Sequence, residues 1–461
     1  MQPLPNAVNW GRHALAKFSK EPAIALKPRT AHALIWCLAL VPVAFFAAGL
    51  GTTDFDSASA ILNMLGRLAG VVGLALLLLA AALSARVPGV DLPFGGLTKL
   101  WRTHHLLGAG SLLLLLAHPL LLAFAASAWG QGLAFSTLFP PLADRATWAG
   151  WMALLLMMVF LAPSFAFFGT PNYERWKRVH ALAGPAVILA LIHTFLFSRT
   201  MPGATDAVIW TLFALLGVGA VGWRLVFSRR IGRLPYRVTQ VNPVADGVTE
   251  ISLQPEQNHL TYAAGNFVYL TPFDPSLAAG HREEHPYTLS SSPLEPELRI
   301  AIKALGDASR AIQTIPVGTR VTVEGPYGRF FPPDALVSSP ELWVAGGVGI
   351  TPFLARMRHL RALDERGDVH LIYAVQDESR AVYAEELRTL AASIPGFALT
   401  FHYFFQEGPV SAAFLQAACP DFARRDVYIC GPLALNRLMR DHAYNAGVSA
   451  NRIHSEEFEL L

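Results

Sequence analysis

The chain has 461 residues, of which 53% are hydrophobic and only 15% are charged. This composition, with a mean hydropathy of +0.38, excludes an ordinary soluble enzyme and predicts a membrane domain. The formal net charge of +3 is too small to indicate a nucleic-acid-binding protein.

Six long apolar segments follow a polar and basic stretch, 1–30, which is expected to be a cytoplasmic N-terminal segment. Each apolar segment is near the ~20 residues that cross a hydrocarbon core about 30 Å thick, so we predict an all-α six-helix membrane domain over 31–228. The late start of the first apolar run argues against a cleavable signal peptide. The predicted spans are 31–50, 61–83, 101–125, 148–168, 176–197 and 207–227.

Lysine and arginine are concentrated in alternate connections between the spans. The basic side comprises Arg12, Lys17, Lys20, Lys27, Arg29, Arg86, Lys99, Arg102, Arg175, Lys177, Arg178, Arg224, Arg229, Arg230 and Arg233. The opposite connections hold little beyond Arg145 and Arg199. The positive-inside rule therefore predicts a multi-pass cell-membrane protein with both termini and everything after Phe227 in the cytoplasm, where reduced nicotinamide nucleotides are available. The three cysteines, Cys37, Cys419 and Cys430, suggest no disulfide framework and agree with a reduced C-terminal half.

The third predicted helix carries three histidines. His104 and His118 are 14 residues apart, which places them on nearly one face of a straight helix and about 21 Å apart. His105 competes with His104, but its spacing of 13 would turn it away from His118. We therefore favour His104.

The fifth predicted helix carries His180 and His193, which are 13 residues apart. A straight helix would place them on different faces. Gly184 and Pro185 lie between them, and a proline kink is one way to bring the pair into line.

Because the third and fifth helices run in the same direction, His104 is expected at the depth of His180, and His118 at the depth of His193. Imidazoles that face each other from two helices suit the two axial positions of a haem iron, and filling both positions favours electron transfer. A histidine-lined zinc or copper channel is the competing interpretation.

Two arginines near helix ends are candidate partners for haem propionates. Arg102 lies at the cytoplasmic end of the third helix, and Arg67 lies about one turn inside the outer end of the second helix. Arg67 is equally consistent with an arginine that reaches back to the membrane interface.

Short strand-like runs at 236–241, 248–253, 267–270 and 298–303 predict a small antiparallel β-barrel in a domain over 234–336. This domain contains the run His285, Pro286, Tyr287, Thr288, Leu289, Ser290 and Ser291. An aromatic residue followed by hydroxyl residues can present a ring to a flat heterocycle and polar groups to its edges. An ordinary strand is equally compatible with this run.

A second candidate in the same domain contains Lys303, Gly306 and Ser309, which precede a predicted helix at 310–314. Free N–H groups at a helix start can hold a diphosphate. A plain capped turn is the alternative.

The last domain, 338–461, has strands expected at 342–345, 369–375, 399–404 and 427–430, alternating with helical segments. This order predicts a parallel α/β sheet of the Rossmann type with a nucleotide at its C-terminal edge. The first strand runs into a turn and helix start that can receive phosphate on backbone N–H groups, although a glycine cluster alone is weak. The turn residues concerned are Gly346, Gly347, Gly349, Ile350, Thr351 and Pro352.

In combination, these motifs resemble the NADPH oxidase and ferric reductase superfamily, in which a six-helix bis-haem domain is fused to a ferredoxin-NADP-reductase-like dehydrogenase. The resemblance covers nearly everything after the first thirty residues. It is carried by the histidine pairs, by 285–291 and 346–352, by Cys430, Gly431 and Pro432, and by the terminal run 453–458. It implies hydride transfer from NADPH or NADH to FAD, then single-electron transfer through an inner and an outer haem b to molecular oxygen or a ferric chelate.

The resemblance also assigns roles to individual residues. Tyr287 would face the flavin ring, Thr288 and Ser290 would contact the flavin or its ribityl chain, and 306–309 would help to hold the diphosphate. Cys430 would lie near the nicotinamide, and Phe458 would cover the flavin until the nicotinamide displaces it. Without the resemblance, Cys430 is a buried small residue and Phe458 a core aromatic.

Three features leave alternatives open. Relatives that select NADPH commonly carry an arginine where this chain has Gln376, and Arg380 is either a partner for a 2′-phosphate or a solvated loop charge. Superoxide-forming members carry a second outer histidine where this chain has Leu122, which weakens oxygen as a dedicated acceptor. Two alternative functions remain: a cytoplasmic flavin reductase with anchoring helices, and a histidine-lined metal or proton channel with a regulatory nucleotide domain. Bound haem would argue against both.

Overall fold

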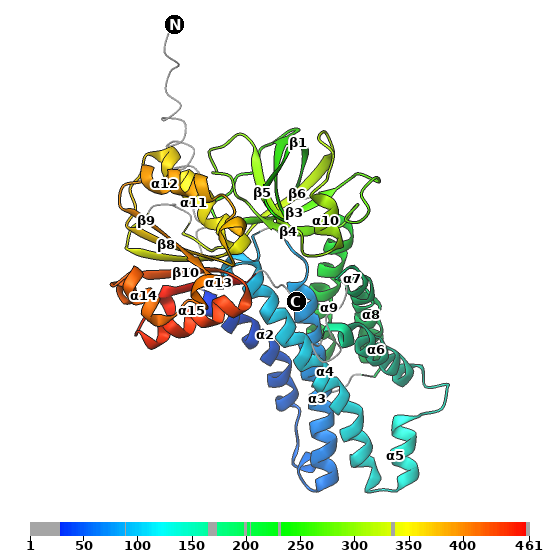
Figure 1. The fold of residues 1–461 in the computed structure, drawn as a ribbon. Helices are drawn as coiled ribbons and strands as arrows, with labels where there is room; N and C mark the ends of the chain where they lie inside the picture. Colours follow the sequence, from blue (N-terminus) through cyan, green and yellow to red (C-terminus); the bar gives the residue numbers. More distant parts are fainter. Residues whose placement is uncertain are drawn as a thin grey trace. The chain divides into compact units, whose positions relative to one another are not determined.

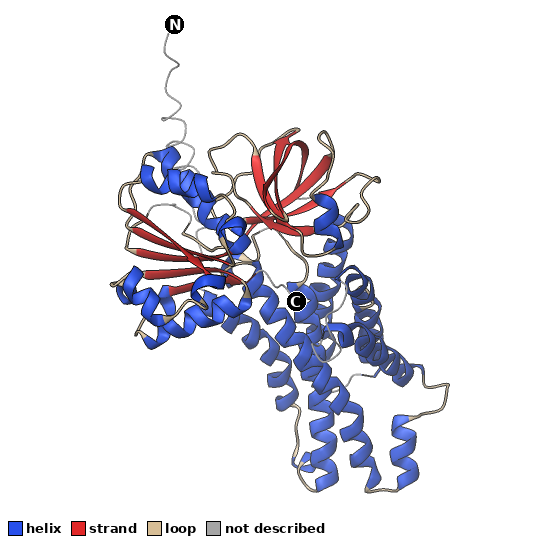
Figure 2. Ribbon diagram, viewed as in Figure 1, coloured by secondary structure: helices blue, strands red, loops and turns tan. Residues whose placement is uncertain are grey.

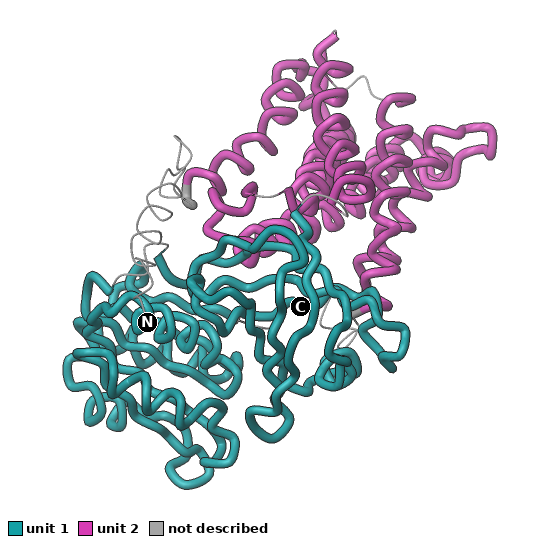
Figure 3. The backbone as a smooth tube through the Cα atoms, turned by 90° about the horizontal axis from the view of Figure 1, so that it is seen from above, with its two compact units in different colours: residues 1–21, 232–461 teal, residues 22–231 magenta. Residues whose placement is uncertain are grey.

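A computed structural model describes residues 28–87, 89–164, 173–197, 201–202, 204–228, 232–332 and 337–457. The chain forms two compact units, which are treated separately: the helical unit, within 22–231, and the sheet unit, within 232–461 (Figure 3). Phe458 lies outside the described residues.

The helical unit consists of long helices joined by short connections (Figures 1 and 2). Its helices are α2 (Pro28–Ala48), α3 (Ala58–Leu83), α4 (Leu97–Ser127), α5 (Gln131–Leu138), α6 (Arg145–Leu161), α7 (Tyr173–His180), α8 (Ala183–Phe197) and α9 (Thr205–Gly222), with a π-helical turn at Trp223–Phe227.

Six helical segments among the described residues are long and apolar enough to cross a membrane, which confirms the predicted six apolar helices. Many of their apolar side chains are exposed in this unit, as at Leu113 (69%) and Leu215 (67%). Such surfaces are stable where lipid covers them, and a helix satisfies its own backbone hydrogen bonds there. The segments are Thr30–Ala48, Ala58–Leu83, Leu97–Ser127, Arg145–Ser164, Glu174–Phe197 and Thr205–Phe227.

One detail of the helical unit was not predicted. The short helix α5 lies in the connection between α4 and α6. The fifth span is broken, because α7 ends at His180 and α8 begins at Ala183. Pro185 lies in the first turn of α8, where a missing N–H costs nothing, so the interruption expected between His180 and His193 is a break just before the proline.

The first part of the sheet unit is a six-stranded antiparallel sheet in the order β4-β3-β6-β1-β2-β5. A bridge between Leu289 and Ile300 joins the end of β4 to β5, and this contact closes the sheet into the predicted barrel. β6 was not predicted. The strands are β1 (Arg233–Ala245), β2 (Val248–Pro255), β3 (Phe267–Pro272), β4 (His285–Thr288), β5 (Leu298–Lys303) and β6 (Arg320–Tyr327), and the helix α10 (Asp307–Ile312) follows β5.

The second part is a five-stranded parallel sheet in the order β11-β10-β7-β8-β9, with helices on its faces (Figure 2). This topology confirms the predicted α/β domain and places the carboxyl ends of all strands at one edge. Its strands are β7 (Glu341–Gly346), β8 (Val369–Val375), β9 (Phe397–Tyr403), β10 (Asp426–Gly431) and β11 (Ile453–Glu457). Its helices are α11 (Thr351–Leu363), α12 (Ala384–Ser393), α13 (Phe404–Glu407), α14 (Ala412–Ala418) and α15 (Leu433–Asn445).

One apolar cluster joins the barrel to the parallel sheet. Val248, Ala301 and Phe331 of the barrel part pack with Trp343 and Phe353 of the α/β part. Because buried apolar area holds the two parts together, residues of both can share one site.

Candidate functional site

The four predicted histidines of the helical unit meet in two pairs. The ring centroids of His104 and His180 are 6.2 Å apart, and those of His118 and His193 are 6.3 Å apart. His105 is exposed. The structure therefore brings together the two pairs that the helix geometry predicts.

Three of these histidines are oriented by backbone carbonyls of a neighbouring helix. The Nδ1 of His104 donates to the Ala80 carbonyl (2.8 Å), that of His118 to Gly66 (2.7 Å), and that of His193 to Ala146 (2.8 Å). Since a carbonyl only accepts, Nδ1 carries the proton and Nε2 keeps its lone pair. This tautomer is the one that a metal-ligating histidine needs.

Small residues make room for two of the rings. A Cβ atom on Gly70 would lie 2.8 Å from Nδ1 of His118, and one on Gly150 would lie 2.8 Å from Nδ1 of His193. Each glycine follows the accepting carbonyl, at Gly66 or Ala146, by four residues. In a helix this spacing puts the glycine directly beneath the ring that the carbonyl orients.

The acceptors form a repeat within the helical unit. Gly66 and Ala80 on α3 are 14 residues apart, and so are Ala146 and Phe160 on α6. Phe160 lies beside His180, with ring centroids 5.1 Å apart. The Nδ1 of His180 makes no hydrogen bond of normal geometry within the described residues, although the Phe160 carbonyl faces it. The spacing of the carbonyls on α6 that face His193 of α8 and His180 of α7 therefore repeats the spacing of those on α3 that orient the two histidines of α4.

The pairs have the dimensions that a bis-histidine metal group needs. A metal–imidazole bond is about 2.0–2.1 Å long and the ring centre lies about 1 Å further on, so imidazoles on opposite sides of one metal have centroids roughly 6 Å apart. Both observed pairs match this distance. The donor set also fits a haem, because each pair would supply two imidazoles to its iron.

The two candidate propionate partners differ in their surroundings. Arg102 is exposed on α4. Arg67 forms an ion pair with Asp54 and lies 5.5 Å above the Phe46 ring. A carboxylate partner for Arg67 was not predicted.

The strand β4 places the candidate flavin residues at the edge of the barrel. His285, Pro286 and Tyr287 are half-buried, and burial raises the pKa of Tyr287. Thr288, Leu289, Ser290 and Ser291 are buried.

The two serines already have partners inside the sheet unit. The Ser290 hydroxyl donates to Glu250 (3.0 Å), and the Ser291 hydroxyl accepts from the Arg299 N–H (3.0 Å). These contacts give both hydroxyls a partner inside the sheet unit, and a contact of Ser290 with the flavin stays a prediction.

The segment from Lys303 to Ser309 forms a capped turn. Lys303 is exposed at the end of β5. The Ser309 hydroxyl accepts from the N–H groups of Leu305 (3.0 Å) and Gly306 (2.8 Å). These two loop amides are thus used by the cap, and a role in holding a diphosphate stays a prediction.

The glycine-rich turn after β7 packs against the end of β10. A Cβ on Gly349 would lie 2.2 Å from the Cys430 carbonyl oxygen, and one on Gly346 would lie 2.8 Å from Pro432. Gly347 has a positive φ of 55°, and its Cβ position is open within the described residues. Gly346 and Gly349 are therefore required by packing, while Gly347 leaves room for a ligand.

The rest of this turn is firmly held. Ile350 and Pro352 are buried, and the Thr351 hydroxyl donates to the Val348 carbonyl (3.0 Å). The Tyr373 hydroxyl donates to the Gly347 carbonyl (3.0 Å).

Cys430, Gly431 and Pro432 lie where β10 ends, at the carboxyl edge of the sheet. Cys430 is fully buried and lies opposite Glu456 in the register of β10 and β11. Burial raises the pKa of the Cys430 thiol well above its ordinary value. The Asn436 amide donates to the carbonyls of Gly431 (3.1 Å) and Glu456 (3.0 Å), which fixes this strand end.

Arg380 follows β8 at the same edge. Its guanidinium donates to the Gln376 side chain, is 3.7 Å from Asp377 and lies 5.9 Å from the Phe405 ring centre. Arg380 is half-exposed, so both of its predicted roles remain open.

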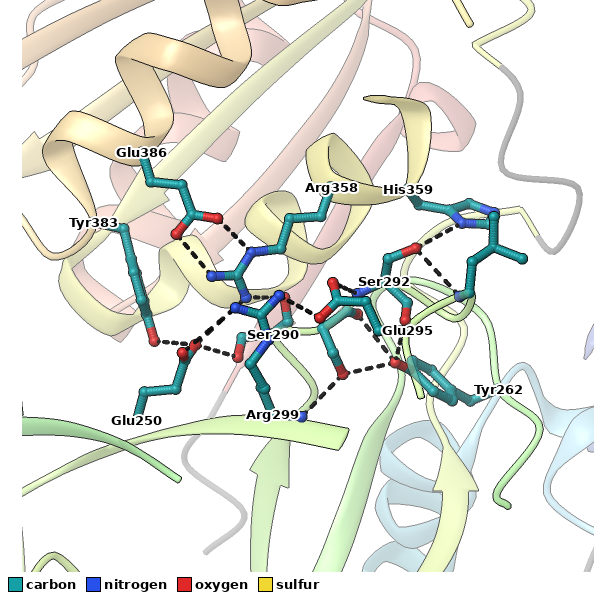
Figure 4. A network of polar contacts seen from close by, with 12 residues as sticks. Glu250, Tyr262, Ser290, Ser292, Glu295, Arg299, Arg358, His359, Tyr383 and Glu386 are labelled. Carbon is teal, nitrogen blue, oxygen red and sulfur yellow. Dashed lines mark hydrogen bonds and ion pairs between the residues drawn. The ribbon is translucent and has the colours of Figure 1, made fainter. Parts of the chain in front are cut away.

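Sequence reasoning missed a buried polar network between the barrel and the parallel sheet, which Figure 4 shows. Glu250 and Arg358 are 108 residues apart in the chain and 3.4 Å apart in space. No local motif signals such a pair.

Three family models match the chain in the order of these parts. A ferric reductase like transmembrane component matches residues 69–191. An FAD-binding domain matches 233–330, and an oxidoreductase NAD-binding domain matches 343–441.

Curated relatives match the C-terminal part. The ferredoxin reductase component of 3-ketosteroid-9-alpha-monooxygenase from Mycolicibacterium smegmatis is 33% identical over 210 residues, which cover 44% of this chain and 58% of the relative. A flavohemoprotein from Bordetella pertussis is 26% identical over 263 residues, covering 52% and 61%. The chain thus spans about three fifths of the length of these relatives.

Among solved structures, the FAD/NAD-binding domain of nitric oxide dioxygenase from Vibrio cholerae is 25% identical, with a TM-score of 0.44. The match covers 48% of this chain and 97% of that domain. The cytochrome P450 reductase GcoB from Amycolatopsis is 22% identical, with a TM-score of 0.43, over 49% of this chain and 69% of that protein.

Proposed function

Because the chain joins a ferric-reductase-like membrane domain to FAD-binding and NAD-binding domains, the architecture of the NADPH oxidase and ferric reductase superfamily, we propose that it carries electrons across the membrane. The FAD- and NAD-binding domains are those of an NAD(P)H-dependent oxidoreductase. The proposed route runs from cytoplasmic NADPH or NADH through FAD and two haem b groups to an external one-electron acceptor.

The observation that carries this proposal is the geometry of the two histidine pairs. Each pair has a separation suited to one metal between two imidazoles. Three of the four rings have Nδ1 committed to a backbone carbonyl. A haem held between such imidazoles would accept and release single electrons.

Each histidine pair has its own place in the proposed route. His104 and His180 lie at the helix ends that carry the basic connections, so they would hold the inner haem, and His118 and His193 would hold the outer haem. The spacing of 14 residues along α4 separates the two sites by about 21 Å. The positive-inside pattern orients the route from the cytoplasm outward.

In the sheet unit, we assign Tyr287 and Thr288 to the flavin and the Gly347 backbone to the nucleotide phosphates. Cys430 would lie beside the nicotinamide, where its burial keeps the thiol neutral. A neutral side chain at this position leaves the hydride path free of a fixed negative charge. Phe458 is proposed to cover the flavin before the nucleotide binds.

The acceptor is proposed to take its electron at the outer haem. Leu122, where superoxide-forming relatives carry a histidine, packs against Gly66 on α3. An aliphatic side chain here offers no proton donor to oxygen. This weakens oxygen as a dedicated acceptor. The proposal therefore includes both oxygen and ferric chelates, and an experiment must separate them.

The test uses the full chain in detergent or nanodiscs. Anaerobic addition of NADPH or NADH should reduce first the flavin and then both haems. Anaerobic reduction of a ferric chelate is then compared with superoxide-dismutase-sensitive dye reduction in air.

Two results would favour the alternative functions. A protein that binds FAD but no haem would be a flavin reductase with anchoring helices. A haem-free protein that passes metal ions or protons into vesicles would be a histidine-lined channel.

A further inference from the structure

A network of buried charged and hydroxyl groups joins the barrel to the α/β part of the sheet unit (Figure 4). Glu250 and Ser290 come from the barrel, while Arg358, Tyr383 and Glu386 come from α11 and the start of α12. The proposed electron route makes no use of Glu250, Arg358, Tyr383 and Glu386.

Glu250 is the centre of the network. It is 7% exposed, and its Oε2 accepts from the hydroxyls of Tyr383 (2.7 Å) and Ser290 (3.0 Å) and lies 3.4 Å from Nη1 of Arg358. Its Oε1 is 3.7 Å from Arg299. A carboxylate taken out of water is stable only with such partners.

Arg358 links three segments of the chain. Its Nε and Nη2 donate to the two carboxylate oxygens of Glu386 (2.6 and 2.7 Å), and its Nη1 donates to the Ser290 backbone carbonyl (2.7 Å). The guanidinium fork fixes direction as well as distance, which a lysine ammonium does not. Arg358 is 6% exposed, so water screens these contacts little.

The network reaches the candidate flavin strand on one side. Ser290 is the second residue after β4, and its N–H donates to the Arg299 carbonyl (2.7 Å). A shift of Arg358 would therefore pull on the chain two residues beyond Thr288.

On the other side it reaches the glycine-rich turn by two paths. Arg358 lies seven residues along α11 from Thr351, or about 10 Å of rigid helix. Tyr383 follows Val382, whose N–H donates to the Tyr373 hydroxyl (3.1 Å), and that hydroxyl donates to the Gly347 carbonyl (3.0 Å). Gly347 is the turn residue that leaves room for a ligand.

We propose that Glu250, Arg358, Tyr383 and Glu386 form an interdomain clamp that sets the position of the nucleotide turn relative to the flavin strand. The clamp rests on the proposed function, because it positions the donor for hydride transfer. Its members are positioning residues, and none of them touches the reacting atoms.

The experiment measures anaerobic flavin reduction by NADPH and NADH in the full-length protein, by stopped flow at a series of nucleotide concentrations. Arg358→Gln and Glu386→Gln each break the fork. Both should lower the limiting rate by on the order of 10- to 100-fold, because small misplacements of reacting groups cost this much. The nucleotide Kd should change by less than about threefold. The long-wavelength absorbance of the stacked nicotinamide and flavin should weaken with the rate.

The matched controls are neighbours on the same two helices. Arg361→Gln removes an arginine that is 55% exposed on α11, and Glu385→Gln removes a carboxylate that is 88% exposed on α12. Both controls should keep the wild-type rate. Arg358→Lys should recover part of the rate. The double variant Arg358→Gln/Glu386→Gln should be no slower than Arg358→Gln, because the single variant already removes the Arg358–Glu386 interaction.

The outcomes separate the clamp from the proposed function. If wild-type protein with bound FAD is not reduced by either nucleotide, the proposed function is wrong and the clamp is wrong with it. If the wild type is reduced but both clamp variants match its rate and absorbance, the clamp alone is wrong. FAD content is measured for every variant, and if Arg358→Gln loses FAD, the half-exposed Glu386 still supplies the test.

Discussion

Gly70→Ala tests whether the glycines beside the histidine rings are needed to leave space for those rings. The new Cβ would lie 2.8 Å from Nδ1 and 3.0 Å from Cε1 of His118. Ordinary contacts of this kind are about 3.5–4.0 Å, so the ring must move by roughly 0.5 Å or more. That movement stretches the 2.7 Å hydrogen bond from His118 to Gly66.

The expected result is partial loss of one haem. A hydrogen bond of this kind contributes about 0.5–1.5 kcal/mol, and loss of a partner behind a metal ligand lowers metal affinity by roughly 10- to 100-fold. Haem per FAD should fall from two toward one in Gly70→Ala, and the low-spin electron paramagnetic resonance signal of one haem should weaken selectively.

Gly219→Ala on α9 is the matched control. Its new Cβ meets nothing within 4 Å among the described residues, so both haems should remain. Full haem content and an unchanged spectrum in Gly70→Ala would refute the seating argument.

Three further predictions concern the sheet unit. Gly349→Ala should abolish flavin reduction by NAD(P)H while dithionite still reduces the bound flavin, because the new Cβ would lie 2.2 Å from the Cys430 carbonyl oxygen; normal turnover with NAD(P)H would contradict this. Burial and the nearby Arg356 lower the pKa of His359 from 6.5 to about 4. Between these pH values the unfolded chain protonates this histidine and the folded protein does not, so the free energy of unfolding should fall by roughly 3 kcal/mol as pH drops from 6.5 to 4. Thermal release of FAD followed over this pH range should show the decline, and His359→Gln should flatten it; equal pH dependence in both proteins would be evidence against this origin. Burial raises the pKa of Cys430, so a water-soluble maleimide should leave it unmodified in native protein, as peptide mass spectrometry would report, and rapid labelling would mean that the thiol is accessible.

The sequence was sufficient for features that depend on local composition. The six apolar spans, the antiparallel barrel and the parallel sheet follow from hydrophobic length and periodicity, and the structure has all three. The helix α5 was missed because its eight residues are too short to stand out between two spans. Strand β6 was missed because it ends in Gly325, Pro326 and Tyr327, where a Gly-Pro pair suggests a turn, and β11 was missed because four of its five residues are polar.

The histidine pairs were predicted from spacing, but their supports were not. Backbone carbonyls at Gly66, Ala80 and Ala146 orient three rings, and a carbonyl leaves no signature in a sequence. Gly70, Gly150 and the repeated spacing of 14 residues are visible in the sequence. Their relation to the histidines cannot be predicted until the neighbouring helices are known. The interruption between His180 and His193 was expected from Gly184 and Pro185, but its place just after His180 was not.

The clamp shows the same limit more strongly. Glu250 and Arg358 look like surface charges in the sequence, and only the fold brings them together in a buried network. Long-range ion pairs of this kind depend on how two domains pack, which no local pattern encodes.

The most direct test of the central claim is an anaerobic titration of the purified protein with NADPH and NADH, followed by visible absorbance. The account predicts that the flavin bleaches and that the bands of two reduced haems per FAD then appear, with one haem lost in His118→Ala or His193→Ala. Flavin reduction without any haem band, or full haem content in every histidine variant, would contradict it.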